Sequence, residues 1–316
     1  MIIQWFPGHM HKAQKEMRKL LPRIDVVIEV LDARVPFSSR NPLIETIRQQ
    51  TPHIKLLNKA DLADEQKTRL WSDFLSGDFE LVVPLNARNY KEAATLPDLC
   101  KSLVEKTQPD KKVRELNALI TGIPNVGKST LINTIMGRAV ARTGNEPAIT
   151  KGHHKIQVND SFVLHDTPGI LWPNLGIQNI GYRLATLGSI RETAIDYADI
   201  GFFAVEFMLQ NYPDLLKDRY AAAVDQALQA TADQALEGPE LAFLENLGRQ
   251  RGAIQRGNLV DLDQASRLFL HELRQGTLGG ITLETPEDEI REKSELQQLA
   301  EAASEKAMKK GKKRRK

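Results

Sequence analysis

The sequence predicts an α/β domain with a mainly parallel sheet, followed by a smaller all-α domain, and three observations support this fold class. Apolar, β-branched runs alternate with helical segments in the first part of the chain, which is typical of a parallel sheet built from βα units. A glycine-rich turn joins a strand directly to a helix near residue 122. After about residue 176, Ala, Leu, Gln and Glu predominate at helical spacing.

The first part of the chain contains predicted strands that are each followed by a helix. The first strand, IDVVIEVL at residues 24–31, is mostly apolar, which indicates burial on both faces, and it ends at the tripeptide DAR. Its helix begins with Asn41 as the N-cap and Pro42 at the first helical position. The following elements are the strand HIKLLNKADL, the helix EQKTRLWSDFL, the strand ELVVPLNARN and the helix LPDLCKSLVEKT.

A charged stretch, PDKKVRE, separates these elements from a second group. The segment LNALITGIPNVGKSTLINTIM predicts a strand, a turn and a helix in direct succession. KIQVND and SFVLHDTPGI then predict two strands joined by a tight Asn-Asp turn. We therefore expect an α/β domain over residues 1–176, a helical domain over residues 177–285, and a charged, disordered tail over residues 286–316.

Composition narrows the class of protein. The single cysteine, Cys100, excludes an internal disulfide framework and a cysteine-built zinc site, and it fits a reducing, cytoplasmic location. The sequence contains neither a signal-peptide pattern nor an apolar run long enough to span a bilayer, so we expect no membrane association. The last eight residues, KKGKKRRK, carry seven positive charges. Such a run binds polyanions, of which nucleic acid is the commonest, or serves only as a solubilising tail.

The segment GIPNVGKST matches the pattern G-x-x-x-x-G-K-[ST] at Gly122, Gly127, Lys128 and Ser129. In this pattern the loop backbone wraps the nucleotide phosphates, the lysine reaches the β and γ phosphates, and the serine hydroxyl binds Mg²⁺. The required strand precedes the loop and the required helix follows it. The sequence therefore predicts a nucleotide site here, with Val126 and Thr130 among its contacts.

The segment DTPG ends an apolar strand downstream of this loop. A carboxylate at Asp166 can hold Mg²⁺ through water, and the Gly169 N–H can meet the γ-phosphate. Thr150 lies between the two loops, where it can supply a second hydroxyl to Mg²⁺, and Thr143 competes for this role. Lys128 and Thr150 are therefore also candidate catalytic residues.

The segment NKAD, with Asn58, Lys59 and Asp61, follows another buried strand. A carboxylate at Asp61 can accept from N1–H and the exocyclic amine of guanine, whereas adenine offers neither donor on that edge. A helix cap preceded by a lysine would look the same, so NKAD depends on the phosphate loop for its interpretation. The segment LNAR ends the next strand, where the Ala87 N–H can donate to the guanine carbonyl. The predicted ligands are GTP and GDP, with further contacts from Asn86 and Arg88.

The order of these motifs resembles a particular family. In Ras-like GTPases the phosphate loop comes first, whereas here NKAD and LNAR precede GIPNVGKST and DTPG. This order, the DAR tripeptide and the opening WFPGHM resemble the YlqF family of circularly permuted GTPases. The resemblance implies a circularly permuted Ras-like P-loop GTPase domain over residues 1–176 and a helical RNA-binding domain over residues 177–285. It also implies a factor that acts late in large ribosomal subunit assembly, binds ribosomal RNA and hydrolyses GTP. We expect a monomer.

The residue that positions the attacking water is not evident from the motifs. Ras-like enzymes commonly use a glutamine after DxxG, but this chain has Ile170, so we expect slow intrinsic hydrolysis that the ribosome stimulates. The family resemblance points to His9 in WFPGHM as the substitute, with His11 as its nearest rival. In the competing interpretation Trp5 and Phe6 fill an apolar groove and His9 only caps a turn.

Other candidate ligands and contacts follow from the resemblance. Asn125 resembles the asparagine that, in some GTPases, helps to hold a monovalent cation, usually K⁺, against the phosphates. The histidines near residues 153–165 lack a supporting pattern for a metal site. An RNA scaffold that binds GTP with little turnover is the alternative function. Candidate RNA contacts, which also fit an ordinary solvated helix surface, are Arg249, Arg251, Arg256, Arg267 and Arg274.

Overall fold

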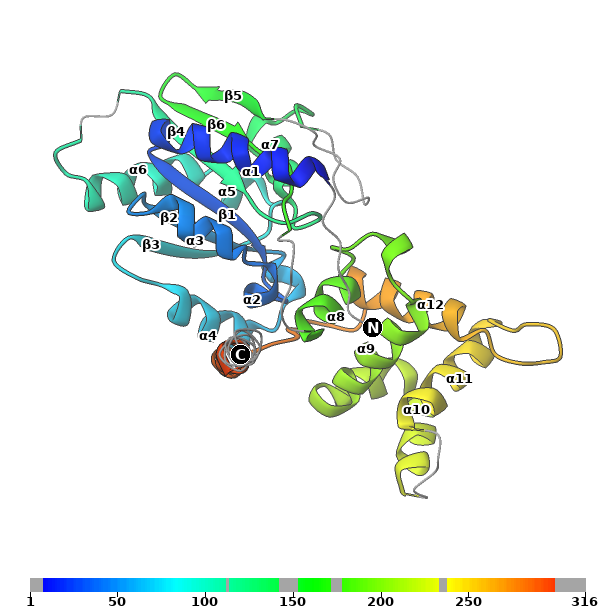
Figure 1. Cartoon of the computed structure of the whole chain (residues 1–316). Coiled ribbons are helices and arrows are strands. Elements are labelled where there is room, and N and C mark those ends of the chain that lie inside the picture. The colour runs from blue at the N-terminus through cyan, green and yellow to red at the C-terminus, as the bar shows by residue number, and fades with distance from the viewer. Residues whose placement is uncertain (1–7, 112–113, 142–152, 172–177, 233–237, 299–316) are drawn as a thin grey trace, which may run out of the picture.

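The computed structural model describes residues 8–111, 114–141, 153–171, 178–232 and 238–298, and only the helical backbone of residues 8–13. A sheet domain and a helical domain lie next to each other (Figure 1). The sheet has six strands in the order β3-β2-β1-β4-β6-β5. In chain order these strands are β1 (Val26–Asp32), β2 (His53–Asn58), β3 (Glu80–Leu85), β4 (Leu116–Thr121), β5 (His154–Asn159) and β6 (Phe162–Asp166).

All neighbouring strands pair in parallel except β5, which pairs antiparallel with β6. The predicted α/β class and the predicted tight turn between the last two strands are therefore confirmed. Every residue of β1 is buried, as expected for a central strand covered on both faces. The pairing of β1 with β4 joins the first group of strands to the second.

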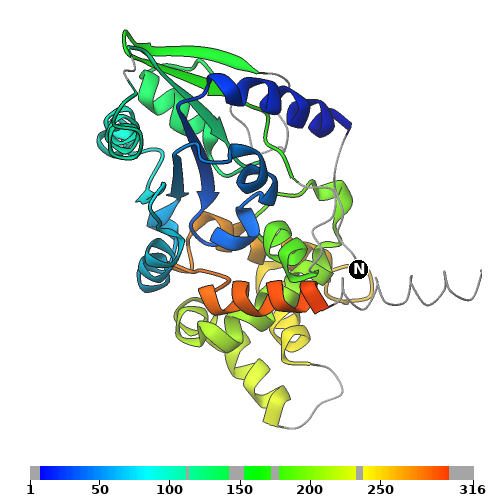
Figure 2. The same cartoon turned by 60° about the vertical axis from the view of Figure 1, so that its left-hand side comes forward.

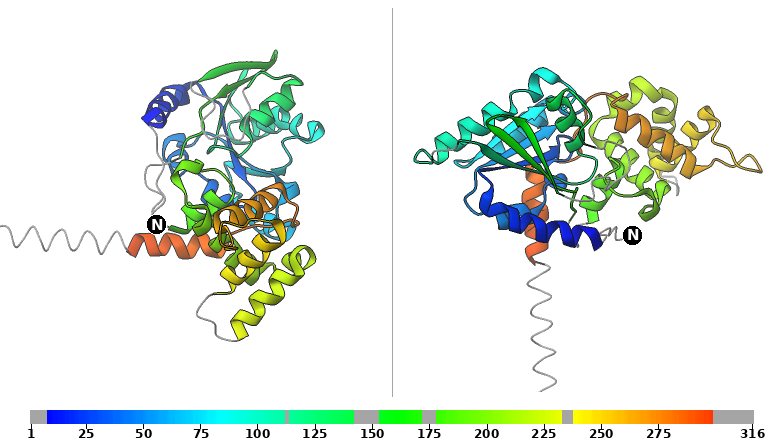
Figure 3. Two further views of the ribbon diagram at one scale, coloured as in Figure 1. Left: turned by 90° about the vertical axis from the view of Figure 1, so that its right-hand side faces the viewer. Right: turned by 90° about the horizontal axis from the view of Figure 1, so that it is seen from above.

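Helices cover both faces of this sheet, and α1 and α6 lie on opposite faces (Figure 3). The predicted N-cap of α3 is confirmed, because the Asn41 side chain accepts from the Leu43 N–H and Pro42 opens the helix. Met17 is fully buried and anchors α1 to the domain core. The helices of this domain are α1 (Gly8–Leu20), α2 (Pro36–Ser39), α3 (Pro42–Arg48), α4 (Glu65–Leu75), α5 (Tyr90–Ala93), α6 (Leu96–Thr107) and α7 (Lys128–Met136).

The second domain is helical, as the sequence predicted. Its centre is an aromatic cluster in which Phe243 meets both Tyr220 and Phe269 edge to face, at centroid separations of 5.6 and 5.5 Å. Its helices are α8 (Gln178–Thr186), α9 (Tyr197–Asn211), α10 (Pro213–Ala232), α11 (Pro239–Arg251) and α12 (Leu262–Gln275). No helix within the described ranges combines the length and the apolar character that crossing a membrane requires.

After α12 the chain returns to the sheet domain as an extended strap, residues 277–284. The Ile281 N–H donates to the Leu62 carbonyl, and the Leu283 N–H donates to the Arg34 carbonyl at 2.8 Å. The Trp71 indole N–H then donates to the carbonyl of Glu284 at 3.1 Å. The strap therefore ties the end of the helical domain to residues from the first quarter of the chain.

Residues 286–298 form a helix, whereas the sequence predicted a disordered tail from residue 286. The helix lies where the two domains meet (Figure 2). Thr285 and Asp288 cap its first turn through reciprocal hydrogen bonds. Glu289 and Glu292 on its inner side are buried and pair with Arg40 and Arg183. These ion pairs, which need distant residues, explain why charge content alone predicted disorder.

Candidate nucleotide site

The predicted motifs converge at one edge of the sheet. NKAD follows β2, LNAR follows β3, the phosphate loop follows β4 and DTPG follows β6. These strands run parallel, so their carboxyl ends lie at the same edge. The strand order, rather than the chain order, brings NKAD and LNAR close to the phosphate loop, since Asn58 bonds to both Val126 and Ala87.

The phosphate loop needs its two glycines for close packing as well as for backbone conformation. Gly122 has a φ of +148°, and a Cβ there would lie 2.4 Å from the Val30 carbonyl oxygen. Gly127 has a φ of +101°, and a Cβ there would lie 2.2 Å from the Asn58 amide nitrogen. Gly127 immediately precedes α7, so the loop delivers the chain to the N-terminus of this helix, where anions bind.

Lys128 is folded into its own loop. Its ammonium donates to the carbonyls of Gly122 at 3.0 Å and Ile123 at 3.1 Å, which uses two of its three N–H groups. Burial lowers the pKa of Lys128 to about 8, and the Asp166 carboxylate opposes this shift. The charge lies inside the loop, where a phosphate oxygen can accept from the ammonium.

Asp166 ends β6 and is almost fully buried. Its Oδ1 atom has no hydrogen-bond partner among the described residues. Burial raises the pKa of Asp166 to about 6, although the charge of Lys128 opposes the shift. A buried carboxylate oxygen without a partner calls for a cation, and a carboxylate with a nearby hydroxyl is the donor set that suits Mg²⁺. Ser129, which would supply the hydroxyl, is half-buried in the first turn of α7.

The DTPG segment packs tightly against the phosphate loop. A Cβ at Gly169 would lie 2.9 Å from the Pro124 nitrogen, so only glycine fits this approach. The next residue, Ile170, donates its N–H to the Gly122 carbonyl at 3.3 Å and is 1% exposed. Its apolar side chain belongs to the core and offers no group to orient water. Thr150 and Thr143 lie outside the described residues.

Asn58 and Lys59 brace the loops around the base site. The Asn58 amide donates to the Val126 carbonyl at 2.6 Å, and its oxygen accepts from the Ala87 N–H at 2.8 Å. Lys59, at a φ of 62°, donates to the Asn125 carbonyl at 2.9 Å. The Ala87 N–H thus bonds to Asn58 in this structure, whereas the sequence analysis assigned it to the guanine carbonyl.

The side chains predicted to face the base lie at the surface of this edge. Asp61 is exposed in the short helix η2 (Ala60–Leu62) that follows Lys59. The Asn86 oxygen accepts from the Arg88 N–H at 2.9 Å, which closes a local turn after β3. The Asp61 carboxylate is therefore accessible to a ligand, and the LNAR turn lies at the end of the next strand.

A buried charge network supports the base loop, and sequence reasoning assigned it no role. Arg34 donates hydrogen bonds to both carboxylate oxygens of Asp32, each at 3.0 Å, and Lys59 donates to the same carboxylate at 2.7 Å. Burial opposes ionisation, but the charges of Arg34 and Lys59 hold the pKa of Asp32 well below its usual range. The detectable signal was the DAR tripeptide at the carboxyl end of a buried strand.

Both parts of the site also touch the helical domain. The Asn125 amide donates to the Gly188 carbonyl at 2.7 Å. Arg34 donates to the carbonyl of Arg274, the next-to-last residue of α12, at 3.1 Å. The phosphate loop and the DAR tripeptide therefore each hold one backbone carbonyl of the second domain.

The structure separates the predicted RNA-contact arginines into three groups. Arg274 is largely enclosed and donates to the carbonyls of Thr186 and Ala185, so it is a structural residue rather than an RNA contact. Arg251 pairs with Glu272, and Arg267 pairs with Asp263 and lies over the Tyr197 ring. The remaining two, which are exposed, are Arg249 and Arg256.

The WFPGHM motif is only partly described. His9 occupies the second position of α1, and His11 lies two residues later, but their side chains, Trp5 and Phe6 lie outside the described residues. His153 and His165 form a ring nitrogen pair at 3.0 Å, and His165 also bonds to Asn117. Both ring nitrogens of His165 and the Nε2 atom of His153 thus contact other groups of the protein.

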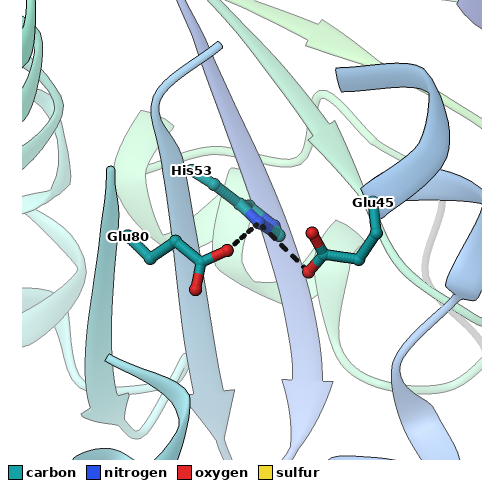
Figure 4. A group of neighbouring side chains, drawn as sticks. All are labelled: Glu45, His53 and Glu80. Atoms are coloured by element: carbon teal, nitrogen blue, oxygen red, sulfur yellow. Dashed lines mark ion pairs between the residues drawn. The ribbon is translucent and has the colours of Figure 1, made fainter. Parts of the chain in front are cut away.

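Glu45, His53 and Glu80 form a second titratable cluster at the opposite edge of the sheet (Figure 4). Two cations already hold these carboxylates, because Arg48 bonds to both glutamates and Lys55 lies 2.8 Å from a Glu80 oxygen. A divalent cation would have to displace or repel these groups. The cluster is therefore a structural ion network at the amino ends of β2 and β3.

Comparison with known proteins agrees with this geometry. The family model described as "50S ribosome-binding GTPase" matches residues 117–237. Ribosome biogenesis GTPase A from Bacillus cereus is 41% identical over 294 residues, covering 91% of this chain and 95% of the relative. Its namesake from Thermotoga maritima is 30% identical over 286 residues, covering 90% of this chain and 95% of the relative.

A solved structure extends the comparison to the fold. GNP-bound YlqF from T. maritima matches with a TM-score of 0.58 and 27% identity, covering 88% of this chain and 99% of that chain. The similarity thus covers both domains. The order of the motifs along the chain is the one that distinguishes the circularly permuted GTPases. This chain is a guanine-nucleotide-binding GTPase of ribosome biogenesis, and it belongs to the ribosome biogenesis GTPase A (YlqF) family.

Proposed function

We propose that this protein is an assembly factor that binds the large ribosomal subunit precursor and its ribosomal RNA, and that hydrolyses GTP when the particle triggers it. The observation that carries the proposal is the arrangement of two groups around one phosphate loop that the base loop braces: the Lys128 ammonium, and the Asp166 oxygen that has no hydrogen-bond partner in the described part of the chain. The names of the relatives supply the ribosomal context. The protein acts as a cytoplasmic monomer in this proposal.

The residues divide the chemistry between them. Lys128 binds the β and γ phosphates, and the loop N–H groups with Thr130 at the start of α7 orient them. Ser129, Asp166 and Thr150 would hold Mg²⁺, which neutralises developing phosphate charge when it is bound. Asp61 selects guanine through two hydrogen bonds. Gly169 lets the segment after DTPG approach the phosphate loop closely enough to respond to the γ-phosphate.

The ribosomal trigger follows from the missing water-positioning group. Ile170 and Leu171 are each 1% exposed, so neither side chain can orient water for attack. His9 lies at the start of α1 on the N-terminal arm, and we assign it the task of hydrogen-bonding the water once the particle positions this arm. Intrinsic hydrolysis is then slow, and the particle supplies the geometry.

The decisive experiment measures GTP turnover by the wild type and His9→Ala, each with and without large ribosomal subunits. Strong stimulation of the wild type, lost in His9→Ala with GTP affinity unchanged, supports a ribosome-gated catalytic arm. Equal stimulation of both proteins means that another group positions the water. If subunits stimulate neither protein, the alternative applies: an RNA scaffold that binds GTP with little turnover, which the burial of Ile170 favours for the isolated chain.

A monovalent cation completes the proposed phosphate site. Asn125 would help to hold K⁺ beside the phosphates, where the ion supplies positive charge as an arginine finger does in other GTPases. Its amide nitrogen donates to the Gly188 carbonyl, which fixes the side chain. Turnover should be several-fold faster in K⁺ than in Na⁺ at equal ionic strength, and equal rates would contradict this part of the proposal.

A further inference from the structure

The outward face of α1 carries an unusual concentration of uncompensated positive charge. Lys15, Arg18 and Lys19 in α1, and Arg23 in the adjoining η1 (Leu21–Arg23), are all exposed. None of the four makes an ion pair within the ranges that the structure describes. The only acidic side chain on this stretch is Glu16. We call these four side chains the α1 cation row.

The packing of α1 fixes the direction of this row. Met17 is fully buried, and Leu20 and Leu21 pack against the same core. Lys15 and Lys19 lie two residues on either side of Met17, which at 100° per residue places both on the opposite face of the helix. Successive cations at a four-residue spacing are separated by about 6 Å along the axis. Lys15, Lys19 and Arg23 follow one another at this spacing, and Arg18 lies to one side of them, on a helix that lies along the outside of the sheet domain (Figure 1).

In the helical domain, by contrast, most arginines have partners within the fold. Arg219 and Arg251 both pair with Glu272, Arg267 pairs with Asp263, and Arg274 is enclosed. These four arginines therefore already have partners within the fold. In contrast, binding a polyanion to the α1 cation row breaks no ion pair among the described residues, so the electrostatic gain is available for association.

We propose that the α1 cation row is a docking surface for the phosphate backbone of RNA. A row of exposed cations along one helix complements the regularly spaced phosphates of a polyanion. A membrane surface does not fit, because the apolar side chains Met17, Leu20 and Leu21 face the protein core and not the solvent. The inference rests on the proposed function for the source of the RNA, which is the large ribosomal subunit.

The row also lies on the helix that begins with the WFPGHM arm. Gly8 and His9 are the first residues of α1, so an RNA strand held along this helix sets the position of the arm relative to the particle. RNA docking therefore precedes the positioning of His9. Loss of the row should reduce subunit-stimulated turnover by lowering occupancy, which excess subunits restore.

The test compares two variants with the same change in charge. In the first, Lys15, Arg18, Lys19 and Arg23 are all replaced by Gln. In the control, the same replacement is made at exposed cations on three other helices of the sheet domain, namely Arg69, Lys91, Lys101 and Lys106. Circular dichroism and GDP affinity establish that both variants fold. Binding to Bacillus cereus large subunits, and to protein-free RNA from them, is then measured across a range of KCl concentrations.

Each phosphate contact contributes about 0.7 to the slope of log K against log salt for single strands, so the α1 variant should lose roughly 3 units of slope. Its affinity should fall at least about tenfold below that of the control at low salt. Equal slopes and affinities for the two variants would overturn the inference. Binding of the wild type to whole subunits but not to the free RNA, with the same dependence on α1, would assign the row to a ribosomal protein and also overturn it.

The same data separate this inference from the proposed function. If subunits neither bind nor stimulate the wild type, the proposed function fails. If they bind and stimulate the wild type and both variants alike, the function stands and the α1 assignment fails.

Discussion

Asp166 and Lys128 are residues whose ordinary chemistry the fold has altered. Burial penalises both charges, and their mutual attraction only partly offsets the penalty. The pKa of Asp166 is raised from 3.8 to about 6, so the folded protein holds this proton more tightly than the unfolded chain. The stability that protonated Asp166 contributes to the folded state is therefore fully present below about pH 4, and it is lost as the pH rises through about 6. At neutral pH the protein retains an ionised carboxylate at a cost in stability, as expected at a cation site.

This reasoning predicts that Asp166→Asn stabilises the nucleotide-free protein. At about pH 7.5 the gain should approach ~3 kcal/mol, because one pKa unit corresponds to about 1.4 kcal/mol, and it should shrink to ~1 kcal/mol near pH 4.5. Urea unfolding of the variant and the wild type at both pH values measures this gain in the free energy of unfolding. The variant should at the same time lose the Mg²⁺-dependent part of its GTP affinity. A variant less stable than the wild type at both pH values would contradict the role of burial.

Asp61 allows a test of base selection. In Asp61→Asn the amide can still accept from N1–H of the base and also donates to the 2-oxo group of xanthine. We expect GDP affinity to fall at least about 100-fold and xanthosine diphosphate affinity to rise. Equilibrium titration with both nucleotides measures this change in nucleotide preference. Asp61→Ala is the matched control, which should lose affinity for GDP without gaining affinity for xanthosine diphosphate.

At the scale of elements, the strap of residues 277–284 closes a buried ion network. Arg183 in α8 pairs with Glu284 of the strap at 3.1 Å and with Glu292 of the following helix at 2.8 Å. Glu284 also accepts from the Ser38 N–H at 2.8 Å. One arginine thus pairs with two buried carboxylates that come from separate elements.

Arg183→Ala should therefore lower the free energy of unfolding by about 3–5 kcal/mol, because it leaves uncompensated charge in the interior. Arg267→Ala, which breaks an exposed pair with Asp263, should cost less than about 1 kcal/mol. Urea unfolding of the two variants gives the comparison. Similar losses for both would mean that the network carries no more energy than a surface pair.

The elements also show where sequence reasoning succeeds and where it stops. Strands, the α3 cap and the motif loops depend on local patterns, and the sequence predicted them. The helix of residues 286–298 carried a local signal in Thr285 and Asp288, but its stability depends on Arg40 and Arg183, which are distant in sequence. The pairing of Asp32 with Lys59 likewise depends on β1 and β2 being neighbours. A single sequence without homologues does not reveal such contacts.

For the whole molecule, the nucleotide site and the helical domain share backbone contacts through Arg34 and Asn125. Nucleotide binding should therefore stabilise both domains. Because a ligand at 100 times its Kd adds about 2.7 kcal/mol, the effect is large enough to follow by hydrogen exchange.

We expect GDP to protect amides in the last turns of α12 as well as in the base loop. Arg34→Lys keeps a cation beside Asp32 but lacks the forked guanidinium that also reaches the Arg274 carbonyl. This variant should retain GDP protection in the base loop and lose it in α12. Protection of α12 that is unchanged by the substitution would mean that Asn125, or another contact, carries the coupling.

The central pairing of Val26 in β1 with Ala118 in β4 has a consequence for biosynthesis. As the chain leaves the ribosome, β1, β2 and β3 emerge first, and the fully buried β1 forms an open edge until β4 follows. The half that carries NKAD and LNAR is therefore synthesised before the phosphate loop GIPNVGKST. GTP can therefore assist folding only at the final closure of the sheet, and the nascent first half must be shielded from other chains until then.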